Sequence, residues 1–311
     1  MIKKEIIDFI VSKKGIKNIE LLEKDLLLTQ LLYYLTKDKD FFDNYAFKGG
    51  TCLIKCYLGY YRFSEDLDFT YTDQKYFKDK SQTKIRGLIS AKIDRLAEII
   101  ERISKILGFR FKAEKENKEY FQYGGGNTFV TFKLWYNSEI AGRETFIKLQ
   151  VNYREGLDHA VKEIKAKSVI SEDMKEEFLL RFPEDAEMLS YPISIKAYDL
   201  KEILIEKIMA ILTRRGVKPR DFIDVYKIIK LENIKIETLS DKIINKTQAM
   251  LKFEKYSLNL EGKQETGFNF EISEEEKMLL IPLDKDFDKF LIDFKVFLQE
   301  LASKFNVKNK K

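Results

Sequence analysis

Two aspartates separated by a single residue are the side chains of this sequence most suited to carry chemistry. Asp66 and Asp68 flank Leu67, and polar and apolar residues alternate from there to Tyr71. Such alternation predicts a half-buried strand, in which residues two apart point to the same face of a sheet. Two carboxylates held side by side repel each other, and a bound divalent cation is the usual reason to keep them together. The pair therefore predicts a Mg²⁺ site, with Mn²⁺ as an alternative ion, of the kind that supports in-line phosphoryl displacement.

Copies of the same aspartate spacing elsewhere limit what the tripeptide alone can establish. Asp38 and Asp40 repeat it, and so does the run from Asp284 to Asp288. These copies lack an alternating apolar strand and a preceding glycine element, so they favour a solvated turn or a helix end. The copy at Asp66 differs because of what precedes it.

A pair of glycines lies upstream of the aspartates. The sequence Lys48-Gly49-Gly50-Thr51 opens a short apolar run over 52–58, which we predict to be helical, and a turn then leads back to the aspartate strand. Glycines let the backbone approach a phosphate closely, and amides at a helix N-terminus offer hydrogen bonds and a favourable dipole. On its own, Gly-Gly-Thr is more often a tight turn with an N-cap. Next to a metal site it predicts a cradle for a triphosphate.

The elements that must position these residues follow from the hydrophobic periodicity. Apolar residues at helical spacing predict amphipathic helices, and alternating ones predict strands. The predicted helices are Ile19–Leu35 and Thr83–Leu107, and the predicted strands are Asp66–Tyr71, Phe109–Ala113, Thr128–Tyr136 and Thr145–Asn152. After a predicted N-cap at Asp199 the pattern is helical to about Arg214, over Arg220–Leu231 and over Phe287–Phe305, and Lys304–Lys311 reads as a frayed tail. This order predicts an α+β fold, with a mixed sheet flanked by helices in residues 1–197 and a helical bundle in residues 198–311.

The composition is that of an ordinary globular protein and not of a disordered one. Of 311 residues, 44% are hydrophobic and 34% are charged, and the net charge of +5 permits a nucleic-acid partner without demanding one. A single histidine excludes His-rich metal sites, and Cys52 and Cys56 are too few for a structural zinc and are predicted to be small buried residues. No segment approaches 18 unbroken apolar residues, and the apolar run near the N-terminus is too short and interrupted for a signal peptide. We therefore expect a cytoplasmic protein without a membrane partner.

Two segments resemble a known family. The run from Phe47 to Phe69, with its glycine pair, Arg62, Ser64 and both aspartates, resembles the first motif of the AbiEii/AbiGii toxin nucleotidyltransferases, a branch of the polymerase-β-like superfamily. A second run resembles the downstream motif of that family and contains Glu206-Lys207, Arg214-Arg215, Arg220-Asp221, Asp224 and Tyr226. The N-terminal helix around Glu23 also fits, so the resemblance frames about 200 residues.

The resemblance implies a polymerase-β-like nucleotidyltransferase domain followed by a helical domain. It implies transfer of a nucleoside monophosphate from an NTP to an acceptor hydroxyl, often the 3′ end of tRNA, by a toxin that works with a cognate antitoxin. Asp66 and Asp68 would hold the metal and carry catalysis. The residues expected to bind the nucleotide or acceptor are Lys48, Gly49, Gly50, Thr51, Arg62, Ser64, Lys148, Lys207, Arg214, Arg220, Asp221 and Asp224. Modification of a protein hydroxyl and a catalytically inactive binding module are the alternative functions.

Two features depart from this expectation or admit another interpretation. Gln150 stands where the family's third carboxylate is expected, and an amide is a poorer metal ligand and no base. Either the strand alignment is shifted, or Glu144 or Glu155 serves instead, or the enzyme is impaired. In the second motif, Lys207 and the aspartates could equally form a solvated surface of salt bridges.

Overall fold

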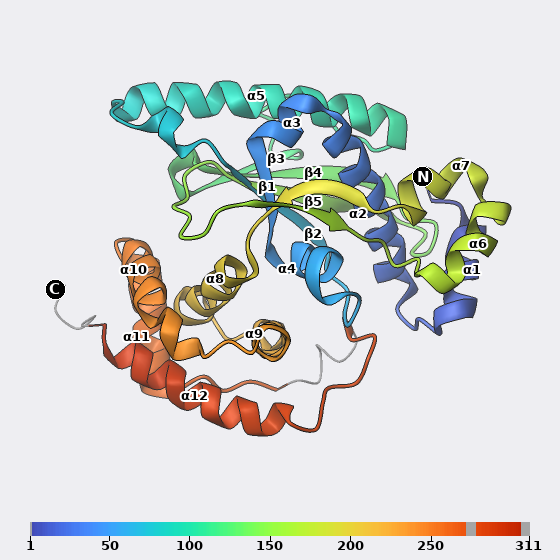
Figure 1. Cartoon of the computed structure of the whole chain (residues 1–311). Helices are drawn as coiled ribbons and strands as arrows, with labels where there is room; N and C mark the ends of the chain where they lie inside the picture. Colours follow the sequence, from blue (N-terminus) through green and yellow to red (C-terminus); the bar gives the residue numbers. More distant parts are fainter. Residues whose placement is uncertain (1, 272–277, 306–311) are drawn as a thin grey trace. The chain divides into compact units, whose positions relative to one another are not determined.

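The computed structural model describes residues 2–271 and 278–305 of the chain (Figure 1). The chain divides after Tyr198 into two compact units. The first contains the sheet, and the second is helical.

A mixed seven-stranded sheet, counted over the described residues, forms the centre of the first unit, in the order β3-β4-β5-β2-β1-β7-β6. Strand β2 pairs in parallel with β5, and β1 pairs in parallel with β7, whereas the other neighbours are antiparallel. The α+β architecture predicted from the sequence is confirmed. The strands are β1 (Tyr45–Lys48), β2 (Asp66–Tyr71), β3 (Phe121–Gly124), β4 (Phe129–Asn137), β5 (Glu144–Asn152), β6 (Lys162–Ala166) and β7 (Ile193–Ala197).

Strand β2 has the alternation that its sequence predicts. Leu67 and Phe69 are fully buried, whereas Asp66 and Asp68 are half-buried on the other face. The Phe69 ring stacks on that of Phe47 of β1 with centroids 5.2 Å apart. Burial of the apolar residues therefore fixes which way the two carboxylates point.

Helices cover the apolar face of this sheet. Figure 1 shows α3 (Lys39–Asn44) and the long α5 (Gln82–Leu107) over the same face. The predicted helices over α2 (Ile19–Lys37) and α5 are confirmed; Asn18 caps the first through the amide of Leu21, and Ser81 caps the second. Asp38 caps α3, so this copy of the aspartate spacing marks a helix end as predicted.

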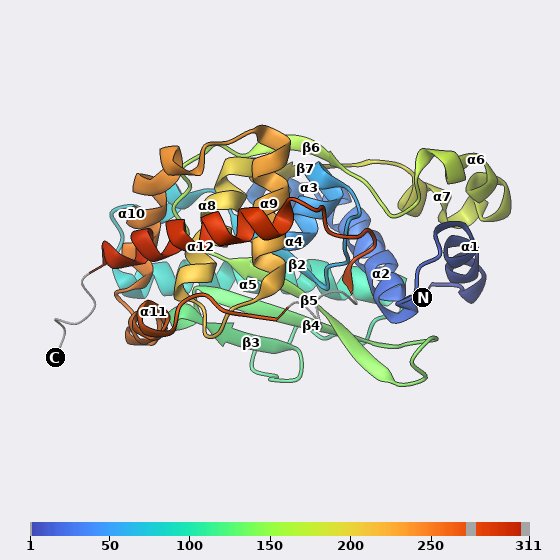
Figure 2. The same ribbon diagram turned by 90° about the horizontal axis from the view of Figure 1, so that it is seen from below.

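Three further helices lie together at one end of the first unit (Figures 1 and 2). They are α1 (Lys4–Lys14), α6 (Glu172–Arg181) and α7 (Pro183–Ser190). The ring of Phe9 lies 6.0 Å from that of Phe178 and 5.8 Å from that of Phe182. This aromatic cluster joins the start of the unit to a segment far along the chain.

One predicted strand is wrong, and four short strands were not predicted. Over Phe109–Ala113 only Arg110 pairs, in an isolated bridge with Trp135 of β4. The outer edge of β4 is already occupied by β3, which takes the hydrogen bonds that a longer strand would need. Phe109 and Phe111 are nevertheless buried. The alternation of apolar and polar residues therefore reflects burial of one side of this segment and not hydrogen bonding to a neighbouring strand. The missed strands β1, β3, β6 and β7 have four or five residues each, too few for a clear period.

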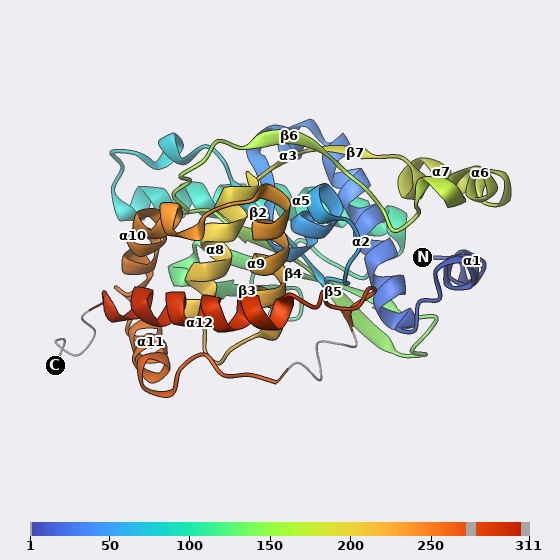
Figure 3. The same ribbon diagram turned by 60° about the horizontal axis from the view of Figure 1, so that its bottom comes forward.

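The second unit is built from helices. Figure 3 shows α8 (Leu200–Thr213) and α9 (Pro219–Glu232) side by side, with α12 (Phe287–Ser303) crossing α9. The predicted N-cap is confirmed, because the Asp199 carboxylate accepts a hydrogen bond from the Lys201 amide at 2.8 Å. Residues 306–311 of the predicted tail lie outside the described residues. Among the described residues, the remaining helices are α10 (Ser240–Met250) and α11 (Glu254–Thr266), and the short 3₁₀ turns are η2 (Gln74–Phe77), η3 (Gly125–Asn127) and η4 (Ile236–Leu239).

The C-terminus of α8 is capped from α11. Lys263, which is 5% exposed, donates from Nζ to the carbonyl oxygens of Ile211 and Arg214, both at 2.5 Å. The amide of Asn259 donates to the carbonyl oxygen of Thr213 at 2.9 Å. A cation at this position complements the partial negative charge of the helix end.

Neither cysteine is in a disulfide; Cys52 is buried, as expected, and Cys56 is half-buried. Among the helices of residues 2–271 and 278–305, none combines the length and the apolar character needed to cross a bilayer.

Candidate active site

The paired aspartates lie in the middle of the sheet. In the register, Asp68 is opposite Lys48 of β1 on one side and Gln150 of β5 on the other. Asp66 is opposite Lys148, whose Nζ lies 3.8 Å from Asp66 Oδ1. Residues paired across neighbouring strands point to the same face, so these five side chains share one surface.

The backbone of the glycine pair lies directly against this surface. Gly49 has a φ of +75°, and a Cβ placed on it would be 3.0 Å from Asp68 Cγ and closer still to one carboxylate oxygen. A Cβ on Gly50 would be 2.8 Å from a guanidinium nitrogen of Arg62. Both positions therefore require glycine, the first for its conformation as well as for space. The predicted cradle and the predicted metal site are adjacent.

Buried side chains brace the turn from behind. The hydroxyl of Thr51, which is 1% exposed, lies 2.8 Å from Ser64 Oγ and within hydrogen-bond distance of the Asp66 carbonyl oxygen. Arg62 is 2% exposed and donates to the carbonyl oxygen of Phe63 at 2.7 Å. These three polar side chains tie the glycine turn to the start of β2.

The turn opens a helical run of unusual geometry. Helix α4 (Gly49–Cys52) continues without a break into the π-helix η1 (Leu53–Leu58), so the run begins three residues before the predicted start at Cys52. A π-helical turn is rare and is frequently found at functional sites. The first amides of the run come from the glycine turn itself.

An amide side chain lies next to the paired aspartates, at the position where the sequence comparison led us to expect a third carboxylate. Gln150 lies opposite Asp68, and its amide donates to Thr131 Oγ1 at 3.1 Å. Glu144 lies at the far end of β5, opposite Asn137, and cannot substitute. Glu155 lies just beyond β5, but its Oε2 accepts hydrogen bonds from Lys48 Nζ at 2.5 Å, Thr70 Oγ1 at 2.6 Å and Tyr198 OH at 2.9 Å.

The donor set fits a metal that is completed by its substrate. Within residues 2–271 and 278–305, no group of three or more His, Cys, Asp or Glu side chains is placed to hold a metal ion by itself. Mg²⁺ typically binds through one or two carboxylates and takes its other ligands from water and substrate phosphates. Asp66 and Asp68, with the glycine turn beside them, match that pattern.

The charged residues of the second motif form a buried cluster between α8 and α9. Lys207 Nζ lies 2.9 Å from Asp221 Oδ1 and 2.6 Å from Asp224 Oδ2, and Arg214 lies 2.6 Å from Asp221 Oδ2. The aspartate side chains are 3% and 0% exposed, so the alternative of a solvated salt-bridge surface is wrong. Burial opposes ionisation of Asp221, but Lys207 and Arg214 outweigh it and hold the pKa of that carboxyl below its ordinary value.

Two arginines beside this cluster remain available to a ligand. Arg215 is exposed and Arg220 is half-buried, and neither forms an ion pair with another described residue. They lie on either side of the break between α8 and α9. Arginines placed in this way suit the phosphates of a nucleotide or of an RNA backbone.

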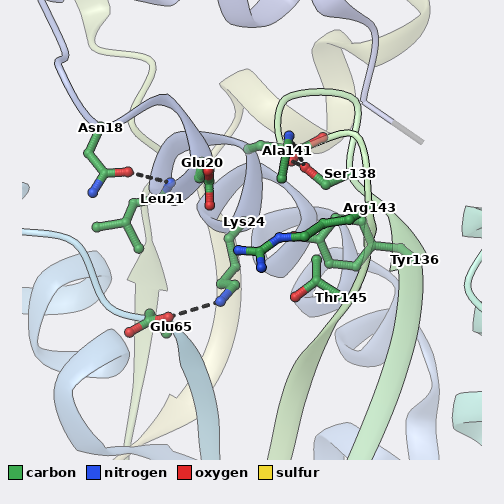
Figure 4. A pocket seen from close by; sticks show the side chains of 11 residues that line it. Asn18, Glu20, Leu21, Lys24, Glu65, Tyr136, Ser138, Ala141, Arg143 and Thr145 are labelled. Atoms are coloured by element: carbon green, nitrogen blue, oxygen red, sulfur yellow. Dashed lines mark hydrogen bonds and ion pairs between the residues drawn. The ribbon is translucent and has the colours of Figure 1, made fainter.

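A separate pocket opens on the other face of the sheet (Figure 4). Tyr136 pairs with Thr145, three residues before Lys148, so alternation puts the pocket opposite the aspartate surface. Burial and then the charges of neighbouring glutamates raise the pKa of Tyr136. The pocket disfavours phosphate, since three glutamates outnumber its two cationic side chains; its charged residues are Glu20, Glu23, Glu65, Lys24 and Arg143.

Sequence reasoning missed the charged partners that hold these residues. Glu155 was considered only as a metal ligand, and its pairing with Lys48 could not be read from the sequence. The buried pair of Asp25 and Lys55, 2.8 Å apart behind the glycine turn, was not predicted at all. Each member comes from a different helix, and no local pattern links them.

Comparisons with known proteins identify the family of the chain. Residues 30–306 match the family described as the nucleotidyl transferase AbiEii toxin of type IV toxin–antitoxin systems. No curated protein sequence matches the chain. Among solved structures, the nucleotidyltransferase toxin MenT4 from Mycobacterium tuberculosis has a TM-score of 0.53 at 16% identity, over 98% of this chain and 99% of that one. JHP933 from Helicobacter pylori has a TM-score of 0.45 at 16% identity, over 91% and 92%. At such identity the likeness to MenT4 shows the fold alone.

Proposed function

The chain belongs to the AbiEii family of nucleotidyltransferase toxins, and from this premise we propose that it transfers a nucleoside monophosphate from an NTP to a hydroxyl of RNA. The observation that supports the proposal is the close approach of Gly49 to Asp68, which puts the backbone of the glycine turn beside two carboxylates on one face. Membership of a type IV system implies an antitoxin partner. We propose that the toxin acts in the cytoplasm, where both NTP and the 3′ end of tRNA are available.

Asp66 and Asp68 would hold Mg²⁺ or Mn²⁺. When bound, the ion supplies charge neutralisation at the phosphates and orients the attacking and leaving oxygens. Of the five side chains on this face, only the two aspartates can accept the proton of the attacking hydroxyl, because an amide such as Gln150 cannot. We therefore assign catalysis to Asp66 and Asp68.

The glycine turn would hold the triphosphate through its backbone. Gly49 and Gly50 have no side chain to keep a phosphate away, and amides at the start of the helical run attract an anion. Thr51, Arg62 and Ser64 contribute by bracing the turn, since their side-chain contacts are within the protein. Lys48 and Lys148 add positive charge on the same face. The ammonium of Lys148 lies 3.8 Å from Asp66 Oδ1.

The second unit would supply cations for the nucleotide or the acceptor. Lys207, Asp221 and Asp224 fix α8 against α9, and Arg214 is held by the same cluster. Arg215 and Arg220, which lie beside this cluster of ion pairs, would then be held in place to contact phosphates. We propose that the two units are a transferase domain of residues 1–197 and a helical domain of residues 198–311.

The proposed activity is tested by labelling. The purified protein is incubated with Mg²⁺ and each [α-³²P]NTP in turn, with bulk tRNA or with a protein lysate freed of RNA. Label in tRNA is the expected result, and label only in protein would replace the RNA acceptor by a protein hydroxyl. No label with any NTP, together with retained nucleotide binding, would favour an inactive binding module.

Salt dependence gives an independent test of the acceptor. Arginines that neutralise RNA phosphates release counterions, so tRNA affinity should fall steeply between about 50 and 300 mM salt. The double variant Arg215→Gln, Arg220→Gln should flatten that slope by about two ions while leaving the buried cluster intact. An unchanged slope would contradict this assignment of the two arginines.

A further inference from the structure

A buried ammonium lies behind the glycine turn. Lys55 is in the π-helix η1, six residues after Gly49, and its side chain is 1% exposed. Its Nζ lies 2.8 Å from Asp25 Oδ1 of α2, 2.8 Å from Thr29 Oγ1 and 2.5 Å from Tyr60 OH. Each of the three protons of the ammonium therefore has a partner within the protein.

The partners close the network into a ring. Tyr60 OH donates to the second carboxylate oxygen of Asp25 at 2.8 Å, and Thr29 Oγ1 donates to the Asp25 carbonyl oxygen at 2.8 Å. Burial, followed by the charge of Asp25, raises the pKa of Tyr60, so the phenol stays protonated as a donor. A lysine so saturated with partners is not available to bind phosphate.

Burying an ion pair between two helices costs desolvation free energy. An apolar pair of similar volume would often hold them at least as firmly, because the charges must lose their water. An ion pair of this kind restricts the relative orientation of the two helices, because the ammonium must donate to three acceptors at once. Here it fixes one rotation and one axial position of the helical run over 49–58 against α2. The carbonyl oxygen of Lys55 also accepts from the Lys167 amide at 2.8 Å, which adds a second point of attachment.

The glycine turn begins that helical run, so whatever fixes the run also fixes the turn. The turn has little freedom of its own, because Gly49 packs against Asp68 and Gly50 against Arg62. A displacement of well under 1 Å would therefore change the distance between the backbone amides and the carboxylates, and catalytic sites are sensitive to shifts of that size.

We propose that Asp25 and Lys55, supported by Tyr60, are positioning residues that set the glycine turn at its distance from Asp66 and Asp68. The inference rests on the proposed function, since it assigns a purpose to the support of the proposed triphosphate cradle. Its consequence is that nucleotide affinity depends on a pair of charges that no nucleotide touches.

The test separates position from stability. Lys55→Met alone leaves Asp25 buried without its ammonium and should be markedly unstable. The double variant Asp25→Leu, Lys55→Met replaces the pair by apolar side chains and should recover the melting temperature. Titration calorimetry with Mg²⁺ and each NTP then measures both the Kd and the number of sites for the full-length double variant. We expect a Kd raised about tenfold with a full complement of sites.

A matched control is available in the other unit. Glu202 of α8 and Lys246 of α10 also form a buried ion pair, and Glu202→Leu, Lys246→Met removes it in the same way. This variant should bind the NTP with the Kd of the wild type.

Two results would overturn the inference. A double variant of Asp25 and Lys55 with an unchanged Kd would show that the pair only stabilises the fold, whether or not the number of sites falls. Wild-type protein that binds none of the four NTPs would remove the proposed function, and this inference with it.

Discussion

Replacement of Gly49 by alanine tests the central contact of the site. The residue has a φ of +75°, and an added Cβ would lie 3.0 Å from Asp68 Cγ. Carbon atoms at rest are separated by about 3.5–4.0 Å, so Asp68 Cγ must move away by at least roughly 0.5–1 Å, and the nearer carboxylate oxygen by more. Left-handed backbone costs an alanine about 1–2 kcal/mol in addition. We expect Gly49→Ala to lose about 100-fold in transfer rate, the effect of a misplacement near 1 Å.

Gly15 provides the matched control for that substitution. Its φ is +62°, and an added Cβ would have no heavy atom within 4 Å. Gly15→Ala should therefore lose a similar 1–2 kcal/mol of stability, seen as a fall of a few degrees in the melting temperature, with wild-type activity. Both variants are assayed by thermal melting and by incorporation of [α-³²P]NMP. If Gly49→Ala kept activity within about threefold of Gly15→Ala, the turn would not lie where phosphate and metal meet, and the assignment of the cradle would fail.

Four further outcomes follow from the geometry. Asp66→Asn and Asp68→Asn should each reduce transfer by more than about 1000-fold with an unchanged melting temperature, and near-normal activity in either would exclude the metal site. Gln150→Glu adds a third carboxylate beside Asp68, so its melting temperature should fall without metal and recover in millimolar Mg²⁺, unlike that of the wild type. Lys207→Met removes the ammonium that two buried aspartates share, although Asp221 keeps Arg214, and should cost about 3–5 kcal/mol in urea unfolding; a loss below 1 kcal/mol would mean that the cluster is solvated. Burial, followed by a neighbouring arginine, lowers the pKa of Lys263 to about 8, so the folded protein releases a proton that the unfolded chain retains up to about pH 10.5. Stability should therefore rise with pH by up to about 3 kcal/mol from this group between those values, and that increment should be missing in Lys263→Met.

The sequence was most informative where burial and local chemistry agree. Around Asp66 and Asp68 the alternation has one apolar face, so the strand, its orientation and the side of the carboxylates could all be predicted. Helix α8 was predictable at both ends, because Asp199 caps it and Gly216 and Pro219 prevent its continuation. These features depend only on residues close together in the sequence, so they can be read without knowing the rest of the fold.

Other features were out of reach because they depend on distant parts of the chain. Phe109 and Phe111 alternate as a strand would, but whether they pair depends on β3 reaching the same edge of β4. The burial of Asp221 depends on the packing of α8 against α9, so spacing alone left a solvated surface open. In the same way, Lys55 reads as an ordinary helical lysine until α2 brings Asp25 to it.

The pairing of β1 with β7 bears on when during synthesis the protein can become active. Phe47 is paired with Ala197, about 150 residues later in the chain, and β2 finds its parallel partner β5 only at Lys148. Contacts between residues so far apart in sequence form late in folding, because closing the long intervening loop costs entropy before the contacts can stabilise the fold. A nascent chain still threaded through the ribosome would thus carry the glycine turn and both aspartates without the neighbours that hold their strands. The protein would become toxic only after nearly all of the first unit has been synthesised. Incomplete chains released midway through translation would be harmless to the cell.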